Sequence, residues 1–215
     1  ELLFVLVHTL FDGGKLAESR QTLEQAIALS QAQHDLPNLA WGRSWLGMYL
    51  GEDNLFDESD QQLLQAEQLF AELGQVTEQM TTISLLAMND FRRGRIAEAA
   101  NRFLKAQHLL SNLNSIVTEY IDSQQVLAVC WFHLAEYQKA LACIQDALEK
   151  SVATPVSFVG VIHSTQASIS AELGDFKQAR KELQIALEWP DYGAYHKLLV
   201  LLNQLRVNQK EKQDN

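Results

Sequence analysis

Two short segments contain residue types that other proteins use to bind phosphate or to attack a carbonyl carbon. Gly13-Gly14-Lys15 is glycine-rich and basic. The phosphate-binding loop G-x-x-x-x-G-K-[ST] needs a further glycine six residues before the lysine and a hydroxyl after it, but Leu16 follows here. Ser44 follows Gly42, but the nucleophile elbow G-x-S-x-G requires glycine where this sequence has Leu46. Neither segment predicts nucleotide binding or covalent catalysis.

Acidic and histidine side chains are too irregularly spaced to predict a metal site. Asp53, Asp57 and Asp60 approach the pattern of a calcium loop, but Leu55 and Ser59 stand where that loop needs ligand or turn residues. The histidines, which show neither H-x-x-x-H nor H-E-x-x-H spacing, are His8, His34, His108, His133, His163 and His196. No two carboxylates are placed in an apolar pocket, as general acid–base catalysis would need. We therefore predict no enzyme activity, no metal and no cofactor.

The composition predicts a folded, helical protein. Of its 215 residues 47% are hydrophobic and 20% are charged, which is typical of a globular chain. Only 3 Pro and 10 Gly interrupt many helix-forming residues. The net charge of −10 arises from 27 acidic and 17 basic residues and would repel a phosphate backbone. Direct nucleic-acid binding is therefore not expected.

The apolar segments and the cysteines favour a cytoplasmic protein. The apolar run Leu2–Val7 has no basic segment before it and ends by Asp12, so it predicts neither a signal peptide nor a membrane span. Cys130 and Cys143 form no C-x-x-C pair and lie among apolar residues, which predicts small buried side chains in a reducing compartment. Because the chain begins with Glu1, we expect it to be a piece of a larger protein.

One pattern recurs five times along the chain: a turn residue, a bulky residue two positions later, and then small, bulky and alanine residues at helical steps. The turn residues are Gly14, Asn54, Gly94, Ala135 and Gly174, and the bulky residues after them are Leu16, Phe56, Ile96, Tyr137 and Phe176. The small residues are Ser19, Ser59, Ala99, Ala140 and Ala179, and the second bulky residues are Leu23, Leu63, Phe103, Ile144 and Leu183. The closing alanines Ala26, Ala66, Ala106, Ala147 and Ala186 are 40, 40, 41 and 39 residues apart. This spacing predicts a repeat protein.

The repeated spacing places the small, bulky and alanine residues on one helix face, where a neighbouring helix can approach closely at the small positions. The preceding turn residue allows the chain to reverse between two antiparallel helices. In the fifth unit Asp175 is placed to cap the second helix, with Gln178 three residues later. Each unit is therefore predicted to be a helical hairpin.

The first helix of the hairpin carries a second signature, in the pairs Leu46-Gly47, Leu86-Ala87 and Leu127-Ala128. Together the two signatures resemble the tetratricopeptide repeat (TPR) from about residue 2 to 189; the best-matching segments are Tyr137 with Lys139-Ala140-Leu141, and Gly174-Asp175-Phe176 with Ala179. Two departures are the period of about 40 residues instead of 34 and the missing proline after the second helix. HEAT and armadillo repeats share the longer period, but their signature is absent. Longer TPR units look like those of bacterial regulators, namely ATP-dependent activators of the maltose-regulator type and sensor proteins.

The predicted fold is an all-α, TPR-like superhelical solenoid of about five antiparallel hairpins plus a final helix. The repeats are predicted at about 1–36, 37–76, 77–116, 117–153 and 154–190, in one domain over 1–208. The second helices are expected near 17–30, 57–73, 97–111, 138–150 and 177–189. A terminal helix is expected over 192–208 and a polar tail over 209–215.

The resemblance implies that the first helix of each hairpin lines a concave face where a protein or peptide binds. The principal groove positions that it assigns are Trp41, Trp45, Met48, Met88, Phe91, Arg92, Val129, Phe132 and His133. The second, third and fourth repeats add Glu52, Ser84 and Gln125, respectively. The fifth repeat supplies Ser164, Ser168 and Glu172, and the first supplies Val5, His8 and Phe11. Exposed clusters of tryptophan and methionine mark interaction sites, but longer helices could instead bury these residues between hairpins.

Both ends of the chain lack the polar face that a terminal repeat normally presents to water. The residues expected to cause self-association are Leu2, Val5, Leu198 and Leu202. The sequence thus predicts a protein- or peptide-binding scaffold within a larger cytoplasmic bacterial regulatory or signalling protein. Two alternatives are a regulatory domain that encloses a small molecule or signalling peptide, and a self-assembly module.

Overall fold

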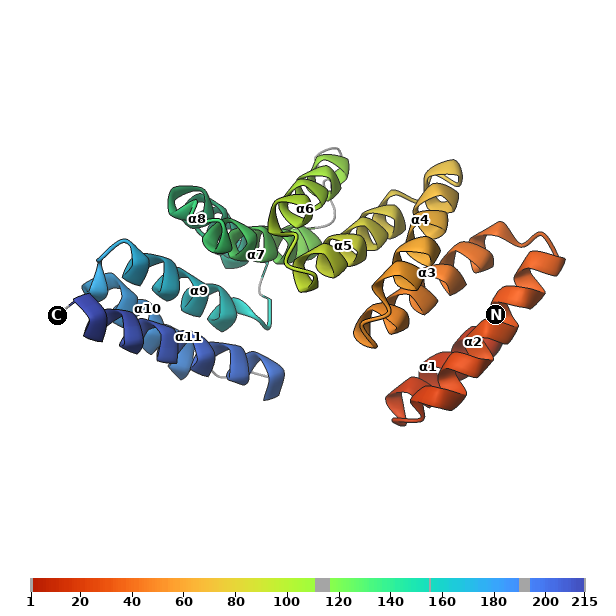
Figure 1. Cartoon of the computed structure of the whole chain (residues 1–215), viewed down its shortest axis with the longest axis horizontal. Helices are drawn as coiled ribbons and strands as arrows, with labels where there is room; N and C mark the ends of the chain where they lie inside the picture. Colours follow the sequence, from red (N-terminus) through yellow and green to blue (C-terminus); the bar gives the residue numbers. More distant parts are fainter. Residues whose placement is uncertain (1, 111–116, 155, 190–193, 215) are drawn as a thin grey trace. The chain divides into compact units, whose positions relative to one another are not determined.

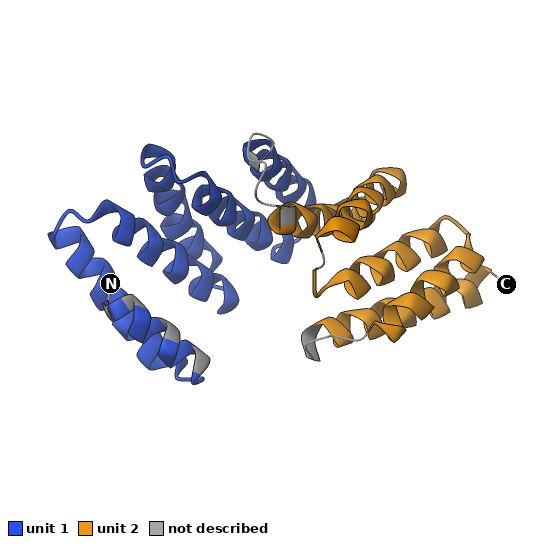
Figure 2. Cartoon of the chain, turned by 180° about the vertical axis from the view of Figure 1, so that it is seen from behind, with its two compact units in different colours: residues 1–112 blue, residues 113–215 orange. Residues whose placement is uncertain are grey.

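The computed structural model describes residues 2–110, 117–154, 156–189 and 194–214. These residues form eleven α-helices and no strand (Figure 1). The helices divide between two compact units, residues 1–112 and 113–215, which Figure 2 colours separately. None of the described helices is both long and apolar enough to cross a lipid bilayer.

The first unit contains three antiparallel hairpins. Its helices are α1 (Leu2–Asp12), α2 (Leu16–Ala32), α3 (Leu36–Glu52), α4 (Phe56–Glu72), α5 (Val76–Arg92) and α6 (Ile96–Leu110). Each hairpin joins consecutive helices, and α3 and α5 also pack on the second helix of the preceding hairpin.

The second unit contains two hairpins and the last helix. Its helices are α7 (Val117–His133), α8 (Tyr137–Ala153), α9 (Val159–Glu172), α10 (Phe176–Glu188) and α11 (Ala194–Asp214). The second helix of each of the five hairpins begins one residue before its predicted start. The prediction of five TPR-like hairpins and a final helix is confirmed.

The predicted turn residues share one backbone conformation. Gly14, Asn54, Gly94, Ala135 and Gly174 all have a positive φ, between 58° and 79°. Glycine adopts this left-handed conformation without a steric penalty, and asparagine tolerates it better than most residues. A chain reversal that needs positive φ therefore explains why a small residue recurs at this position.

The hairpin seam shows how the small residues act. Ser59, Leu63 and Ala66 on α4 are fully buried, and the Ser59 hydroxyl donates to the Gly47 carbonyl of α3 at 2.6 Å. A Cβ atom added at Gly47 would lie 2.5 Å from Cγ of Leu63. The two helices can therefore approach this closely only because position 47 has no side chain.

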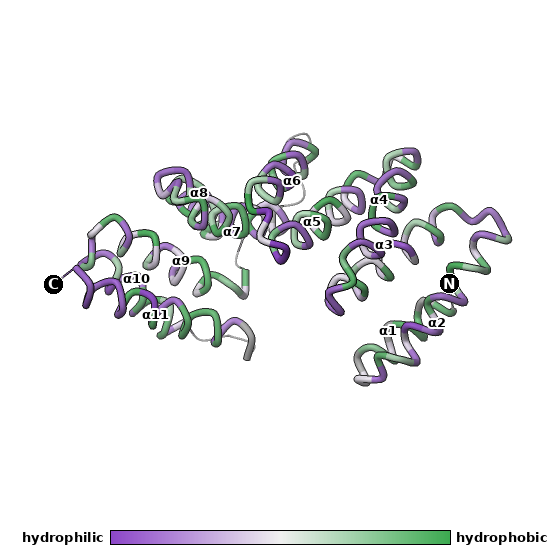
Figure 3. The backbone as a smooth tube through the Cα atoms, in the orientation of Figure 1, coloured by the Kyte–Doolittle hydropathy of each residue, from purple (hydrophilic) through white to green (hydrophobic). Residues whose placement is uncertain are grey.

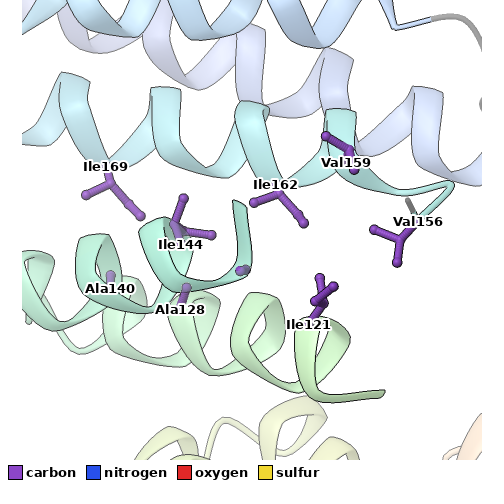
Figure 4. Close-up of a cluster of buried hydrophobic side chains, with 9 residues drawn as sticks. Ile121, Ala128, Ala140, Ile144, Val156, Val159, Ile162 and Ile169 are labelled. Atoms are coloured by element: carbon purple, nitrogen blue, oxygen red, sulfur yellow. The ribbon is translucent and has the colours of Figure 1, made fainter. Parts of the chain in front are cut away.

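The core of the second unit lies between its first three helices. Ile121 and Ala128 of α7 pack with Ile144 of α8 and with Ile162 and Ile169 of α9 (Figure 4). At the start of α10 the Asp175 carboxylate accepts from the Gln178 amide N–H at 3.0 Å, so the predicted cap is present. This packing leaves α9 in the interior of the unit.

The final helix differs from its prediction in length. It continues to Asp214, so described residues 209–214, which were predicted to be a tail, are helical, although Figure 3 shows this end to be hydrophilic. Charged pairs within the helix and with neighbouring helices account for the extension, because Lys210 lies 3.3 Å from Asp214 and 3.8 Å from Glu172. Glu211 also pairs with Arg180 of α10.

The final helix also departs from the repeat in its packing. Whereas α3, α5 and α9 pack on the second helix of the preceding hairpin, α11 packs mainly on α9. Val200 and Val207 of α11 are buried, in clusters with Val161 and Ala167 of α9. The helix therefore covers the last hairpin instead of beginning a sixth repeat.

Candidate functional site

Four of the predicted groove residues line one small hollow in the first unit. Met48 and Glu52 come from α3, and Met88 and Arg92 come from α5. The hollow measures about 30 Å³, which is room for a water molecule or the tip of one side chain. The Arg92 guanidinium donates to the Gly51 carbonyl of α3 at 3.1 Å, and this bond connects the two hairpins at the rim.

The same hollow contains Asn89, which the sequence did not identify as a site residue. Its side-chain amide is buried and donates to the Ser59 hydroxyl and to the Asp60 carboxylate, both at 2.8 Å. Asp60 also accepts from Arg93 at 2.7 Å. The signal available in the sequence was a polar residue, Asn89, at a position of α5 that faces the neighbouring helices. This network joins α5 to α4, and Asn89 also lines the hollow.

The two tryptophans of α3 do not line this hollow. Trp45 is half-buried and packs edge-on against Phe11 of α1, with ring centroids 6.4 Å apart, and against Tyr49 at 6.2 Å. Trp41 is 42% exposed and contacts Phe70 of α4 at 6.0 Å. Phe91 of α5 is half-buried and also lies outside the lining. Trp45 is thus partly buried between two hairpins, which is the alternative that the sequence left open.

In the second unit the last helix reaches the predicted groove residues of α7. The Arg206 guanidinium lies 5.0 Å from the centroid of the Phe132 ring, which also contacts His133 at 5.8 Å. Burial, and secondarily the positive charge of Arg206, lowers the pKa of His133 below its usual value. Val129 is half-buried. The Arg206 side chain of α11 thus lies over one of these predicted site residues and near a second.

The fifth-repeat groove positions are covered by the same helix. Ser164 and Ser168 of α9 are buried, and the Asn203 amide of α11 donates to the Ser164 hydroxyl at 3.0 Å. Lys210 pairs with Glu172 at the other end of this contact. An intramolecular helix therefore occupies the part of the predicted face that the fifth repeat contributes.

Residues predicted to cause self-association are exposed where their side chains are described. Val5 is 64% exposed, Leu198 54% and Leu202 51%. The side chains of Leu2 and His8 lie outside the described part of the structure. On α11, Leu201 and Leu205 are exposed as well.

The two thiols lie in apolar surroundings. Cys130 is fully buried, and burial raises its pKa to about 12 and the pKa of half-buried Cys143 to about 11. Among the residues that the structure describes, no three histidine, cysteine or acidic side chains are grouped as metal ligands would be. The described side chains therefore form neither a thiolate centre nor a metal centre.

No protein-family model and no curated protein matches the sequence. Several solved structures are similar in fold. BtubC (BKLC) from P. vanneervenii has a TM-score of 0.77 at 16% identity, with 89% of this chain and 84% of that chain covered. A putative kinesin light chain from Podosopora anserina with nearly identical TPR-like repeats has a TM-score of 0.69 at 16% identity, with 86% and 92% covered.

A third similar structure is the apo form of RapI. Its TM-score is 0.80 at 18% identity, with 98% of this chain and 60% of RapI covered, so this chain spans less than two thirds of RapI. At these identities the likeness concerns the fold, which is that of TPR-like repeat proteins.

Proposed function

We propose that this chain is a protein- or peptide-binding module of a larger cytoplasmic bacterial regulatory or signalling protein, and that a partner segment docks in the first unit across α3 and α5. The observation that carries this proposal is the convergence of Met48, Glu52, Met88 and Arg92 from two consecutive hairpins. Their residue types suit a partner surface, because flexible methionines repack around different ligands and the rim offers one charge of each sign.

The size of the hollow favours a protein partner over an enclosed small molecule at this place. A volume of about 30 Å³ cannot hold a metabolite but accepts the tip of an alanine or valine side chain. We infer that a partner segment inserts one small apolar side chain between the methionines. Its backbone or neighbouring polar groups then pair with Glu52 and Arg92.

The test is a selection of binding peptides from a random displayed library with the full chain, followed by calorimetric titration of the selected peptides. Met88→Gln should weaken binding about tenfold or more without a matching loss of thermal stability. Arg92→Glu should weaken binding as much and also lower stability, because it removes the bond to the Gly51 carbonyl. Leu64→Gln, at an exposed position of α4, is the matched control and should leave affinity unchanged. Peptides that bind the Met88→Gln and wild-type chains equally well would contradict this site.

Self-assembly is a second candidate function, supported by an exposed leucine stripe on α11. The stripe consists of Leu198, Leu201, Leu202 and Leu205, which are 41–58% exposed and spaced so that they share one helix face. When two copies of α11 pair antiparallel, Leu198 meets Leu205 and Leu201 meets Leu202, so the stripe is self-complementary about a two-fold axis. A contiguous exposed apolar patch of this kind is a candidate interaction surface.

Sedimentation equilibrium of the wild-type chain and of Leu202→Glu tests this candidate. We expect a dimer that dissociates in the variant, because a carboxylate at the centre of the pair would be desolvated without a partner. Leu104→Glu, which alters an exposed leucine of α6, should leave the dimer intact. A monomeric wild type at high concentration would rule out assembly through α11.

A further inference from the structure

The second unit contains a cavity that no groove residue lines and that opens to solvent beside Val152, which is 85% exposed. Its walls come from α8, α9 and the residue that follows α10; the lining residues are Leu148, Ser151, Val152, Val159, His163 and Trp189. The cavity measures about 400 Å³, within the range of small-molecule sites and more than ten times the volume of the hollow in the first unit. Apart from the imidazole, the indole N–H of Trp189 and one hydroxyl, the lining is apolar.

The imidazole is held in place by a buried carboxylate. Nδ1 of His163 lies 2.6 Å from Oε2 of Glu182 on α10, and the Glu182 side chain is only 6% exposed. The other Glu182 oxygen accepts from the Gln178 side-chain amide at 2.5 Å. An ionised carboxylate only accepts, so it pairs with an Nδ1–H, and in the neutral ring this tautomer presents Nε2 as an acceptor. Trp189 lies beside the ring, with centroids 6.2 Å apart.

The second nitrogen of this ring takes no part in the pair. Among the described residues no hydrogen bond to Nε2 of His163 accompanies the one at Nδ1, and the His163 side chain is 16% exposed. A pair that served only to join α9 to α10 could be replaced by apolar side chains with little loss of stability, and often with a gain. The His163–Glu182 pair instead holds in one orientation an imidazole that lines an apolar cavity.

We propose that this cavity binds a phenol ring, whose hydroxyl donates to Nε2 of His163 and whose ring packs between Trp189 and Val159. Three features select this chemistry. The apolar walls favour an aromatic ring, Nε2 requires a hydrogen-bond donor, and the adjacent Glu182 carboxylate disfavours anions. The phenol can belong to a free small molecule or to a tyrosine side chain of a peptide.

The test measures binding of 4-methylphenol and toluene to the full chain by ligand-observed NMR and calorimetry. These probes differ only by the hydroxyl, so the wild type should prefer 4-methylphenol by about tenfold, the value of one well-made hydrogen bond. His163→Leu should abolish this preference while toluene still binds. A merely structural role of His163 would lower stability but leave the selectivity unchanged.

A second variant keeps the test decisive if His163→Leu does not fold. Ser151→Phe should fill the cavity and abolish binding of both probes. The loss of the Ser151 hydroxyl is tolerable, because within the described residues it bonds only the nearby Leu148 carbonyl. N-acetyl-tyrosinamide distinguishes the two sources, since binding tighter than 4-methylphenol indicates a peptide tyrosine and weaker binding indicates a free phenol. Equal affinity of the wild type for 4-methylphenol and toluene, or no binding of either, would overturn the proposal. Either result leaves the proposed docking site on α3 and α5 unaffected.

Discussion

The guanidinium of Arg206 lies over the aromatic ring of Phe132, 5.0 Å from its centroid. This contact joins α11, the last helix of the second unit, to α7, the first helix of the same unit. Such a cation–π contact contributes roughly 0.5–1 kcal/mol at a partly exposed site. It accompanies the Asn203–Ser164 hydrogen bond and the Lys210–Glu172 ion pair, which both join α11 to α9. These three contacts hold α11 on the face that was predicted to receive a partner.

Replacing Arg206 by Gln should raise the pKa of His133. The pKa should remain below the ordinary value of 6.5, because burial is the larger cause of its depression and Arg206 the smaller. A depressed folded-state pKa means that the unfolded chain binds the proton more readily, so stability is lost as pH falls below about 6.5. Histidine NMR titration and urea unfolding at acidic and neutral pH should show a smaller acid-induced loss in the variant. An unchanged His133 titration would contradict the contact.

Replacing Trp45 by Ala should destabilise the first unit more than replacing Trp41. Trp45 is half-buried between α1 and α3, so truncation leaves a cavity and should cost ~2 kcal/mol, somewhat less than for a fully buried tryptophan. Trp41 is exposed on one side, and its loss should cost about half as much. Urea unfolding of both variants makes the comparison. Equal losses would show that Trp45 is not part of the packing between the first two hairpins.

A methyl group at position 47 should collide with Leu63. Gly47→Ala should cost about 1–3 kcal/mol, because the added Cβ would lie 2.5 Å from a fully buried side chain and 3.2 Å from the Ser59 carbonyl. Combining it with Leu63→Ala should be less harmful than the sum of the two changes, since the smaller side chain leaves room for the methyl group. A double-mutant cycle by urea unfolding measures this coupling. Strict additivity would disprove the close approach.

Both cysteines should react slowly with a disulfide reagent in the folded chain at pH 8. Only the thiolate attacks, and burial raises the pKa of Cys143 to about 11 and of Cys130 to about 12. With its pKa at about 11, the Cys143 thiol is far less ionised at pH 8 and should react roughly a hundredfold more slowly than in the unfolded chain. Absorbance of the released thiol, with and without urea, provides the measurement. Rapid labelling of the native chain would mean that the thiols are accessible.

Helix positions and the repeat were readable from the sequence because their causes are local. The five turn residues, at positions that require positive φ, and the small, bulky and alanine residues at i, i+4 and i+7 each lie within one hairpin. The second helices could therefore be located to within three residues at either end. The convergence of Met48 with Met88 followed as well, since consecutive repeats present equivalent positions on one face.

Contacts between helices could not be read in the same way, because they depend on how each helix is rotated and where it crosses its neighbours. Trp45 and Met48 are three residues apart on α3, yet one packs on α1 and the other lines the hollow with α5. Likewise, no periodic signal shows that α11 packs on α9 and covers Ser164, or that His163 meets Glu182 beside a cavity. Such pairs join residues 19 to 39 positions apart, and only the packing of whole helices brings them together.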